Sequence, residues 1–434
     1  MSPIEVALIL FGTFTALVLL RVPVAFALGL ACVPVFFIDE RLTPFLLLNE
    51  MLKSYNSFLL LAIPFFMLAA NLMNSAGITD KLINLSKVLV GWMPGGIGHV
   101  SVLVSMLFAG ISGSSTAEAA GVGGVLIPAM KKQGYDTRFA VALIACAAVM
   151  GVVIPPSILM VVWGGVISVS IGGLFLAGVL PGALMGLSFM VVVYFHAKKH
   201  KLPVYPRPTV PEFIFALGHA ILPILTPGII VGGIVGGLFT PTEASVVAVL
   251  YALLLGVFVY RKLAPGQLIE TLYDSARLAA ISLFCIGTAS AFGWLLAYFH
   301  IPQLFVNMVS QWGAGVTSVG FLTALCFLVV GCFIDAIPAI IIVGTVLAPM
   351  AESVGMHPIH FAIIGVISIA YGLVTPPYGL CLMIACTIGG IKIKQALGYT
   401  LILFVPLLLV LLFVILSPEA LLWLPRLLMP KFVN

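Results

Sequence analysis

Hydroxyl and carboxylate oxygens interrupt an apolar stretch in the first half of the chain. The segment GISGSSTAEAAGVGGVLIPAM, residues 110–130, holds the hydroxyl residues Ser112, Ser114, Ser115 and Thr116, and Glu118 follows two positions later. A single hydroxyl in an apolar helix usually bonds to its own helix or to a neighbouring helix. A cluster of hydroxyls, in contrast, offers several oxygens to one bound ion or molecule. Such oxygens suit a small cation such as sodium. Glu118 is interpreted equally well as a further ligand or as a residue that caps or packs the segment.

The amino-acid composition indicates whether this cluster lies in water or in a membrane. Of 434 residues, 62% are hydrophobic and 8% are charged, whereas soluble proteins carry about 25% charged residues. Apolar runs at 4–20, 22–37, 59–76 and 397–416 are long enough to cross a bilayer as helices. The sequence therefore predicts an all-α polytopic membrane protein. Its net charge of +5 does not indicate nucleic-acid binding, because the basic residues cluster between the apolar runs.

A second acid lies in an apolar stretch of the second half, CFIDAIP at residues 332–338. A carboxylate at the centre of a membrane helix costs about 3 kcal/mol on insertion scales, so we interpret Asp335 as functional. Glu243, in FTPTEAS at 239–245, is instead expected to cap the helix that follows. The sequence shows no Ser-His-Asp, HExxH, Walker or GxGxxG pattern, which predicts that the protein is not an enzyme and uses no organic cofactor.

The chain resembles itself at an offset of 221 residues. Seven glycines and prolines of the first half match the second half, where about one match is expected by chance. Because these residues set the places where helices stop and restart, the match predicts two structural repeats, residues 1–200 and 214–434, joined by a linker at 201–213. The matched pairs are Gly110 and Gly331, Gly123 and Gly344, Pro128 and Pro349, Gly134 and Gly355, Gly151 and Gly372, Pro155 and Pro376, and Pro156 and Pro377.

The charges predict that the repeats have inverted topology. KKQGYDTR at 131–138 carries three basic residues, and its counterpart AESVGMHPIH at 351–360 carries no Lys or Arg. By the positive-inside rule these loops face opposite sides of the membrane. Full crossings are expected near 4–20, 22–38, 58–76, 137–170 and 174–196, which places both termini outside and the linker inside. Fifteen of the 19 Lys and Arg residues then lie inside, and four lie outside: Arg41, Lys53, Arg426 and Lys431.

Each repeat contains a segment that enters the membrane and returns. Residues 96–130 and 316–350 are too long for one crossing, and the sequence predicts re-entrant helical hairpins with SGSS and CFIDAIP at their tips. Helices broken by a double proline follow at 137–170 and 359–389, and amphipathic helices at Ile78 to Trp92 and Pro302 to Trp312 precede the hairpins. A broken helix leaves carbonyl oxygens free to bind a cation, and its free amino end suits an anionic group. Both hairpin tips are therefore expected to face one internal site formed with the broken helices.

These motifs together resemble a known family over nearly the whole chain. GISGSSTAEAAGVGGVLIPAMKKQGY, GVVIPPS, GGLFTPTEAS and VTPPYG are similar to segments of the large membrane subunit of tripartite ATP-independent periplasmic (TRAP) transporters, in the ion-transporter superfamily. The resemblance implies a static scaffold, a transport domain that moves as an elevator, and sodium coupling. It also implies two protein partners, a separate small membrane subunit and a periplasmic substrate-binding protein.

The resemblance also implies site residues, carried over motif by motif. The expected sodium ligands at the first tip and first break are Ser112, Gly113, Ser114, Ser115, Ile154, Pro155 and Ser157. Those at the second tip and second break are Asp335, Ala336, Ile337, Thr375 and Pro376. The expected substrate contacts are Ser115, Thr116, Pro156, Pro338 and Pro377.

The function predicted from these observations is sodium-driven import of a small organic anion across a bacterial inner membrane. A C4-dicarboxylate, a sugar acid, a related acid or a sulfonate would suit the site. A carrier or antiporter that works without a binding protein is the first alternative. A channel is disfavoured because mirror-related closed tips do not form a continuous pore, and a membrane enzyme is the weakest alternative.

Overall fold

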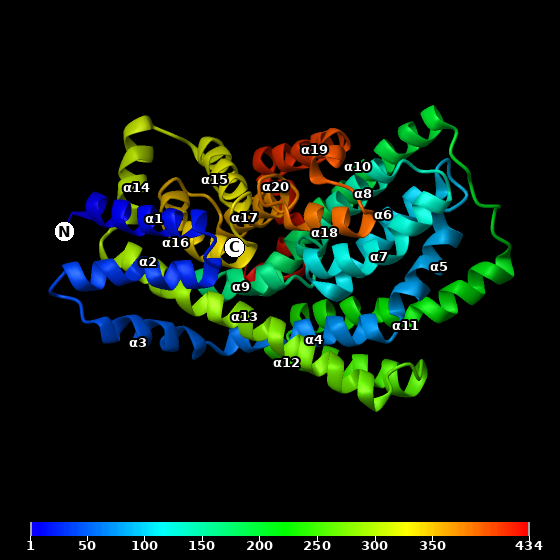
Figure 1. The fold of residues 1–434 in the computed structure, drawn as a ribbon, viewed down its shortest axis with the longest axis horizontal. Helices are drawn as coiled ribbons and strands as arrows, with labels where there is room; N and C mark the ends of the chain where they lie inside the picture. The colour runs from blue at the N-terminus through cyan, green and yellow to red at the C-terminus, as the bar shows by residue number, and fades with distance from the viewer. Residues whose placement is uncertain (1, 433–434) are drawn as a thin grey trace.

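The computed structural model describes residues 2–432, and every regular element in this range is a helix (Figure 1). Residues 1, 433 and 434, the ends of the two expected repeats, lie outside the described residues. Within 2–432, seven helical segments are long and apolar enough to cross a bilayer. The chain is thus the multi-pass helical membrane protein that the composition predicts.

The first half contains ten α-helices. They are α1 (Pro3–Leu19), α2 (Val24–Ile38), α3 (Pro44–Tyr55), α4 (Ala62–Ser75), α5 (Ile78–Val90), α6 (Gly96–Ser112), α7 (Ser115–Lys132), α8 (Thr137–Ala148), α9 (Ile158–Ile167) and α10 (Ile171–His200). Short 3-10 turns precede α4 (Phe58–Leu61) and follow α8 (Val149–Val152).

The second half contains ten more in the described range. They are α11 (Val210–Val235), α12 (Pro241–Leu253), α13 (Pro265–Tyr298), α14 (Ile301–Trp312), α15 (Val316–Gly331), α16 (Ala336–Ser353), α17 (Pro358–Gly372), α18 (Leu380–Gly389), α19 (Ile393–Leu416) and α20 (Pro418–Leu428). A π-helical turn (Leu254–Val259) extends α12, and a 3-10 turn (Pro430–Phe432) follows α20.

The two halves repeat one order of elements with opposite direction. A shift of 221 residues carries both ends of α7 onto both ends of α16, and it carries α5, α6, α8 and α9 onto α14, α15, α17 and α18 within a few residues. Helices α5, α6 and α7 lie toward the right end of the molecule, and α14, α15 and α16 lie toward the left (Figure 1). The hairpins α6–α7 and α15–α16 thus lie toward opposite ends of the molecule, as the predicted inverted repeats require.

Local residue choice explains why each hairpin reverses. Helix α6 stops at Gly113, whose φ of +61° lies in the left-handed region that glycine tolerates. A Cβ atom there would come within 2.9 Å of the Pro156 carbonyl oxygen. Ser114 then caps α7 by accepting from the Ala117 N–H at 3.5 Å, and Asp335 begins α16 by accepting from the Ala336 N–H at 2.8 Å.

The broken helices form the buried centre on which the tips dock. All ten residues from Phe139 to Ala148 of α8 are buried, as are all residues of α17 from Ile359 to Gly372, and a helix that is apolar all round must be enclosed. Each helix breaks at its double proline. The first tip docks through a bond from the Ile158 N–H to the Gly113 carbonyl at 3.2 Å, and the second through Tyr378 N–H to the Cys332 carbonyl at 3.0 Å.

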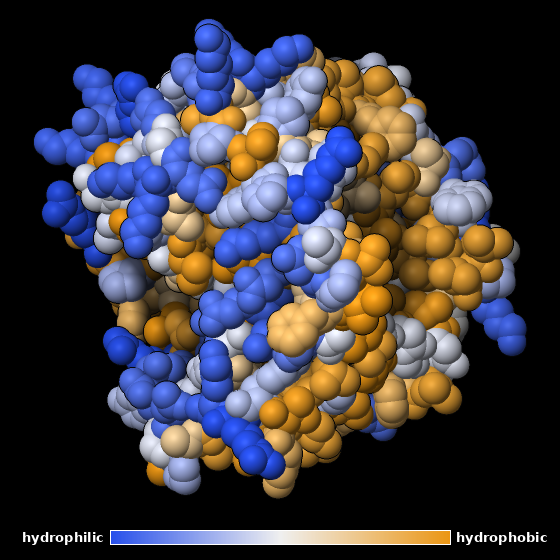
Figure 2. Space-filling view, turned by 90° about the vertical axis from the view of Figure 1, so that its right-hand side faces the viewer, coloured by the Kyte–Doolittle hydropathy of each residue, from blue (hydrophilic) through white to orange (hydrophobic). Residues whose placement is uncertain are grey.

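Helices α2, α3, α4, α12 and α13 form an outer layer along one side of the hairpins, and α19 and α20 lie on the opposite side (Figure 1). Helix α4 packs between α12 and α13, and α2 and α3 pack on α13. The sequence did not predict α3 or α20 as separate helices. Residues 210–213 of the expected linker belong to α11, and the non-helical segment between α10 and α11 is 201–209. Hydrophilic side chains cover much of the end that carries this segment, bordered by hydrophobic surface (Figure 2).

Glu243 has the capping role that the sequence predicts. Its carboxylate accepts from the backbone N–H of Thr240 at 2.7 Å, and the Thr240 hydroxyl accepts from the Glu243 N–H at 3.3 Å. This reciprocal capping box satisfies two free donors at the start of α12. Glu243 therefore stabilises a helix end.

Candidate binding site between the hairpin tips

A cavity of about 330 Å³ lies where the two hairpin tips meet the two helix breaks. The first residues of four helices line it: Ser115 and Thr116 of α7, Ile158 and Leu159 of α9, Ala336 and Ile337 of α16, and Leu380 of α18. The first N–H groups of a helix lack partners within the helix, and its amino end carries a partial positive charge. Four such ends around one cavity form an environment for a negatively charged group.

Oxygen atoms of both tips line the same cavity. The hydroxyls of Ser114 and Thr116 lie 3.1 Å apart, and the Ser115 hydroxyl is buried without a hydrogen-bond partner. From the opposite tip, the exposed Asp335 also lines the cavity. Asp335 is the one acidic residue among the lining residues. The cavity therefore combines a carboxylate and several hydroxyls with four positive helix ends.

The structure brings together most of the tip residues predicted from the sequence. Those that line the cavity are Gly113, Ser114, Ser115, Thr116, Asp335, Ala336 and Ile337. Ser112 lines an adjoining cavity, also about 330 Å³, which shares Ser114 and Thr116 with the first. Both tips thus contribute to one connected space.

The predicted residues of the helix breaks and Pro338 do not line either cavity. These are Ile154, Pro155, Pro156, Ser157, Pro338, Thr375, Pro376 and Pro377. The two hydroxyls among them bond within their own broken helices, Ser157 to the Val152 carbonyl at 2.6 Å and Thr375 to the Tyr371 carbonyl at 2.8 Å. Val152, Leu373 and Leu380 line the cavity from the breaks instead. Cation ligation by the break residues stays a prediction.

The outer layer also contributes residues that the sequence analysis missed. Met67 of α4 and Leu278, Ile281 and Ser282 of α13 line the first cavity. Polar residues lie three, four or seven positions apart along α13, at Thr271, Asp274, Ser275, Arg277 and Ser282. This spacing places polar groups on a limited part of the helix surface, and it is the signal that could have identified the α13 wall.

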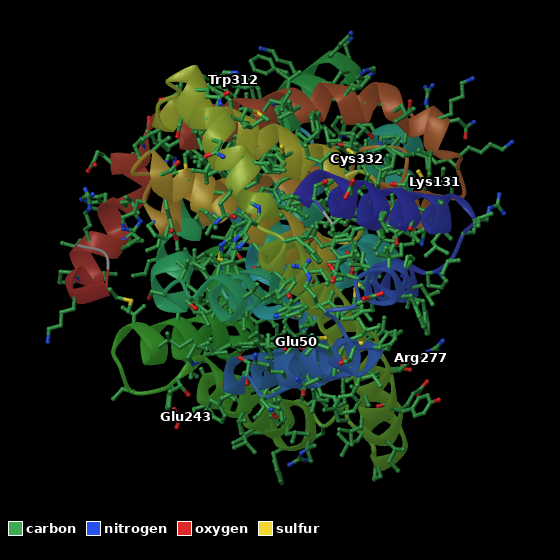
Figure 3. The ribbon with its side chains drawn as sticks, turned by 90° about the vertical axis from the view of Figure 1, so that its left-hand side faces the viewer. Glu50, Lys131, Glu243, Arg277, Trp312 and Cys332 are labelled. Carbon is green, nitrogen blue, oxygen red and sulfur yellow. The ribbon has the colours of Figure 1, made fainter. Side chains whose placement is uncertain are left out.

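The cavities continue as a groove between α4 and α13. The second cavity includes Asn71 and Asn74, and these residues also line a third cavity of about 470 Å³ with Asp274 and Arg277. Leu278 lines all three cavities, so they are neighbours along one route. Figure 3 labels Arg277 on α13 at one end of this route and Cys332 at the second tip.

This architecture defines a class of protein. A polytopic helical chain with inverted repeats, broken helices and a polar site at the repeat interface is a secondary transporter. Residues 11–420 match the family described as tripartite ATP-independent periplasmic transporter, DctM component. The chain belongs to this family, which confirms the resemblance seen in its motifs.

Related proteins are transporter permeases. The chain is 38% identical to the sialic acid TRAP transporter large permease protein SiaM of Vibrio cholerae, over 87% of this chain and 89% of that protein. It is 36% identical to the C4-dicarboxylate TRAP transporter large permease protein DctM of Pseudomonas aeruginosa, over 83% of this chain and 86% of that protein. The protein is therefore a transporter permease subunit and not an enzyme.

A solved structure shares the fold at low sequence identity. The YdaH transporter of Alcanivorax borkumensis, described as having an unusual topology, superposes with a TM-score of 0.59 at 15% identity, covering 86% of this chain and 88% of that one. This likeness concerns the arrangement of helices alone.

Proposed function

We propose that this protein is the large permease subunit of a TRAP transporter that imports a small organic anion together with sodium. The observation that carries this proposal is the convergence of four helix amino ends on a cavity that also contains Asp335. The two relatives named above carry sialic acid and C4-dicarboxylates in their names. Both are carboxylic acids, which supports a carboxylate as the substrate class.

The charges of the cavity suggest how sodium and substrate are coupled. Each helix end favours an anion by up to about 2 kcal/mol in a partly buried setting. The Asp335 carboxylate opposes this, since two like charges about 5 Å apart at an effective dielectric constant of 20 repel by about 3 kcal/mol. A sodium ion bound at Asp335 removes the repulsion. The substrate therefore binds more tightly once sodium is bound, and sodium is retained better once the substrate is bound.

The sodium ligands proposed are those of the two tips and breaks. Ser112 to Ser115 with the segment 154–157 would hold one ion, and Asp335 to Ile337 with Thr375 and Pro376 would hold another. The residues fit a hard cation because they offer hydroxyl, carbonyl and carboxylate oxygens. In both halves the tip is bonded directly to the break, which supports a shared ion at each junction.

An elevator movement follows from the arrangement of the two layers. We define the transport unit as the hairpins α6–α7 and α15–α16 with the broken helices α8–α9 and α17–α18, and the scaffold as the remaining helices. The cavity lies between them, lined by α4 and α13 of the scaffold. The transport unit would carry substrate past this wall, and the groove toward Arg277 would be its exit to the cytoplasm. Two partners complete the proposal, a small membrane subunit beside the scaffold and a periplasmic protein that delivers the anion.

Uptake by reconstituted vesicles tests this proposal. The chain would be purified with its small subunit, and radiolabelled succinate or sialic acid would be supplied with a matching periplasmic binding protein. We expect accumulation that requires an inward sodium gradient and is lost when potassium replaces sodium. Equal uptake without the binding protein would favour the stand-alone carrier, and flux that ignores the sodium gradient would contradict coupling.

A further inference from the structure

Glu118 is a buried carboxylate that no protein group neutralises. It lies on α7, one turn beyond the cavity residues Ser114 and Ser115, and its side chain is 0% exposed. Neither carboxylate oxygen has a hydrogen-bond partner, and Glu118 takes part in none of the ion pairs within residues 2–432. An unpaired charge in such a place is strongly disfavoured, so the carboxyl must either take up a proton or bind a counter-ion.

Other unsatisfied oxygens surround this carboxylate. The Ser105 hydroxyl of α6 faces Glu118, and the Cys381 thiol of α18 lies beside both Glu118 and Ser115. The hydroxyls of Ser105 and Ser115 are buried next to the Glu118 carboxylate and the Cys381 thiol, and neither hydroxyl nor the carboxylate forms a well-aligned hydrogen bond. Two hydroxyls and a carboxylate without partners thus meet in one closed region between both arms of the first hairpin and α18. Buried polar groups almost always have a hydrogen-bond or ion partner, so we expect a bound ion or molecule to interact with this cluster.

Gly151 in the first break packs directly against the carboxylate. A Cβ atom at Gly151 would lie 2.6 Å from Oε2 of Glu118 and 3.1 Å from the carbonyl oxygen of Ser114, so only glycine lets both oxygens come this close to the backbone of the break. A carboxylate oxygen and a carbonyl oxygen on the same side of one backbone segment are ligands of the kind that a hard cation takes.

The second repeat shows that hairpin packing does not require this acid. The residue equivalent to Glu118 is Ala339, and the residue equivalent to Gly151 is Gly372. A Cβ atom at Gly372 would lie 2.5 Å from the Gly331 backbone, so there the two chains pack directly on each other. The first repeat holds a carboxylate at this junction instead. Each hairpin then carries one acid next to the cavity, Glu118 in the first and Asp335 in the second.

We propose that Glu118 is the charged ligand of the sodium ion at the first tip, together with the hydroxyls of Ser105 and Ser115. This inference rests on the proposed sodium coupling and names a residue of that site outside the tip motif. The cation neutralises the carboxylate and supplies the partner that the two hydroxyls lack. Sodium at this place also ties α6 to α7, so it closes the hairpin before the transport unit moves.

Sodium-dependent stability tests this assignment without measuring transport. The full chain in detergent would be heated in sodium chloride or in choline chloride of equal ionic strength, and binding of radioactive sodium would be measured in parallel. The isosteric change Glu118→Gln removes the charge and keeps the shape. We expect at least tenfold weaker sodium binding at one site and a smaller sodium-dependent rise in melting temperature. In choline chloride the variant should melt no lower than the wild type, because no buried charge is left unpaired.

Matched variants separate ligand loss from general damage. Glu352→Gln makes the same change at an exposed position of α16 and should leave sodium binding unchanged. Ser105→Ala should weaken sodium binding, and Gly151→Ala should do so because the added methyl group displaces the carboxylate. Gly124→Ala, on α7 with open space around it, is the control for the glycine change.

The outcomes distinguish this inference from the function on which it rests. If the wild type binds sodium and Glu118→Gln binds it equally well, the role of Glu118 is refuted while sodium coupling stands. If the wild type itself shows no sodium response, the coupling fails and the Glu118 assignment fails with it. Should Glu118→Gln not fold, Ser105→Ala decides the question, since unchanged sodium affinity in that variant would overturn the proposal.

Discussion

Ser114 and Asp335 occupy equivalent positions in the two repeats and differ in charge. Each precedes the returning helix of its hairpin and accepts from an N–H of that helix, Ser114 from Ala117 and Asp335 from Ala336. Both residue types are good helix caps, so capping alone does not explain why the second tip carries a carboxylate. The difference places the cavity's negative charge on one side of an otherwise positive ring of helix ends.

The change Asp335→Asn separates these two roles. Asparagine caps helices as well as aspartate, so we expect the stability to change by no more than about 0.5 kcal/mol. The charge that attracts sodium is lost, so sodium-driven uptake in vesicles should fall to background. Thermal unfolding in detergent checks the first expectation and labelled uptake checks the second. A variant that still accumulates substrate like the wild type would remove Asp335 from the sodium site.

Ser157 is a predicted cation ligand whose hydroxyl has a structural use. It donates to the Val152 carbonyl at 2.6 Å and accepts from the Met160 N–H at 3.3 Å, which closes the break before α9. We expect Ser157→Ala to destabilise the protein by about 1 to 2 kcal/mol through the lost cap and hydrogen bond. Ser157→Thr keeps both bonds and should restore the melting temperature. If Ser157→Ala melts like the wild type but loses sodium affinity, the hydroxyl acts as a ligand alone.

At the scale of elements, glycine and proline made the hairpins and breaks predictable. Gly113 and the double prolines mark places where a helix cannot continue, and the structure ends or begins helices within a few residues of them. Helix α3 was not predicted because its counterpart in the second half is part of one continuous helix, α13. The comparison of the two halves therefore did not indicate where α3 begins and ends. The spacing of polar residues along α13 marks a polar face, but which segments this face meets is decided by packing between distant parts of the chain, so the wall was missed.

The turn between α7 and α8 depends on a charged cap. Asp136 accepts from the Arg138 N–H at 2.8 Å, and its carboxylate pairs with the Arg138 guanidinium at 2.6 Å. The guanidinium beside Asp136 holds the pKa of that carboxyl below its usual range. A lowered pKa in the folded state stabilises the fold above the pKa of the unfolded chain, about 3.9 for aspartate, and this stability is lost as the pH falls below that value.

The change Asp136→Asn tests this contribution. At pH 7 the variant should be less stable by about 0.5 kcal/mol, because a largely surface ion pair is worth little. The difference should shrink as the pH falls below about 4 and through the lowered pKa of the folded state, where the wild-type carboxylate also becomes neutral. Melting temperatures measured across this pH range check the sign. In a protein that already carries Arg138→Gln, the change Asp136→Asn should lower the stability at pH 7 by a smaller amount. A stability difference between the wild type and Asp136→Asn that grows as the pH falls would contradict the ion pair.

At the scale of the molecule, the two repeats meet asymmetrically around one cavity. The tips supply polar groups from opposite ends, whereas the wall opposite them comes from α4 and α13 of the scaffold. From this wall a groove leads past Asn71 and Asn74 to Arg277. The side chains of the wall are also bonded across the two helices, Asn71 to Ser275 at 2.8 Å and Ser75 to Thr271 at 3.1 Å. These bonds join α4 to α13 in the wall past which the transport unit is proposed to move.

Arg277 is placed to receive an anion that leaves the cavity. It lines the outer part of the groove and forms none of the ion pairs within residues 2–432. A guanidinium binds carboxylates in a bidentate way, and it lies beyond the tips, so it should affect release more than capture. We expect Arg277→Gln to lower the maximal uptake rate several-fold and to leave the concentration for half-maximal uptake nearly unchanged. Inhibition by substrate loaded inside the vesicles should weaken as well, because the same site accepts anions from the inner side.

The control for this prediction is Arg261→Gln, which makes the same change just before α13 at an exposed residue outside the groove. Initial rates would be measured over a range of outside concentrations, with and without substrate inside. The two variants carry the same net charge, so a general effect of charge on the vesicle surface would appear in both. A loss confined to Arg277→Gln and to the maximal rate places the arginine on the exit route. A change in the half-maximal concentration instead would place it at the cavity itself, and equal behaviour of both variants would remove the groove from the transport path.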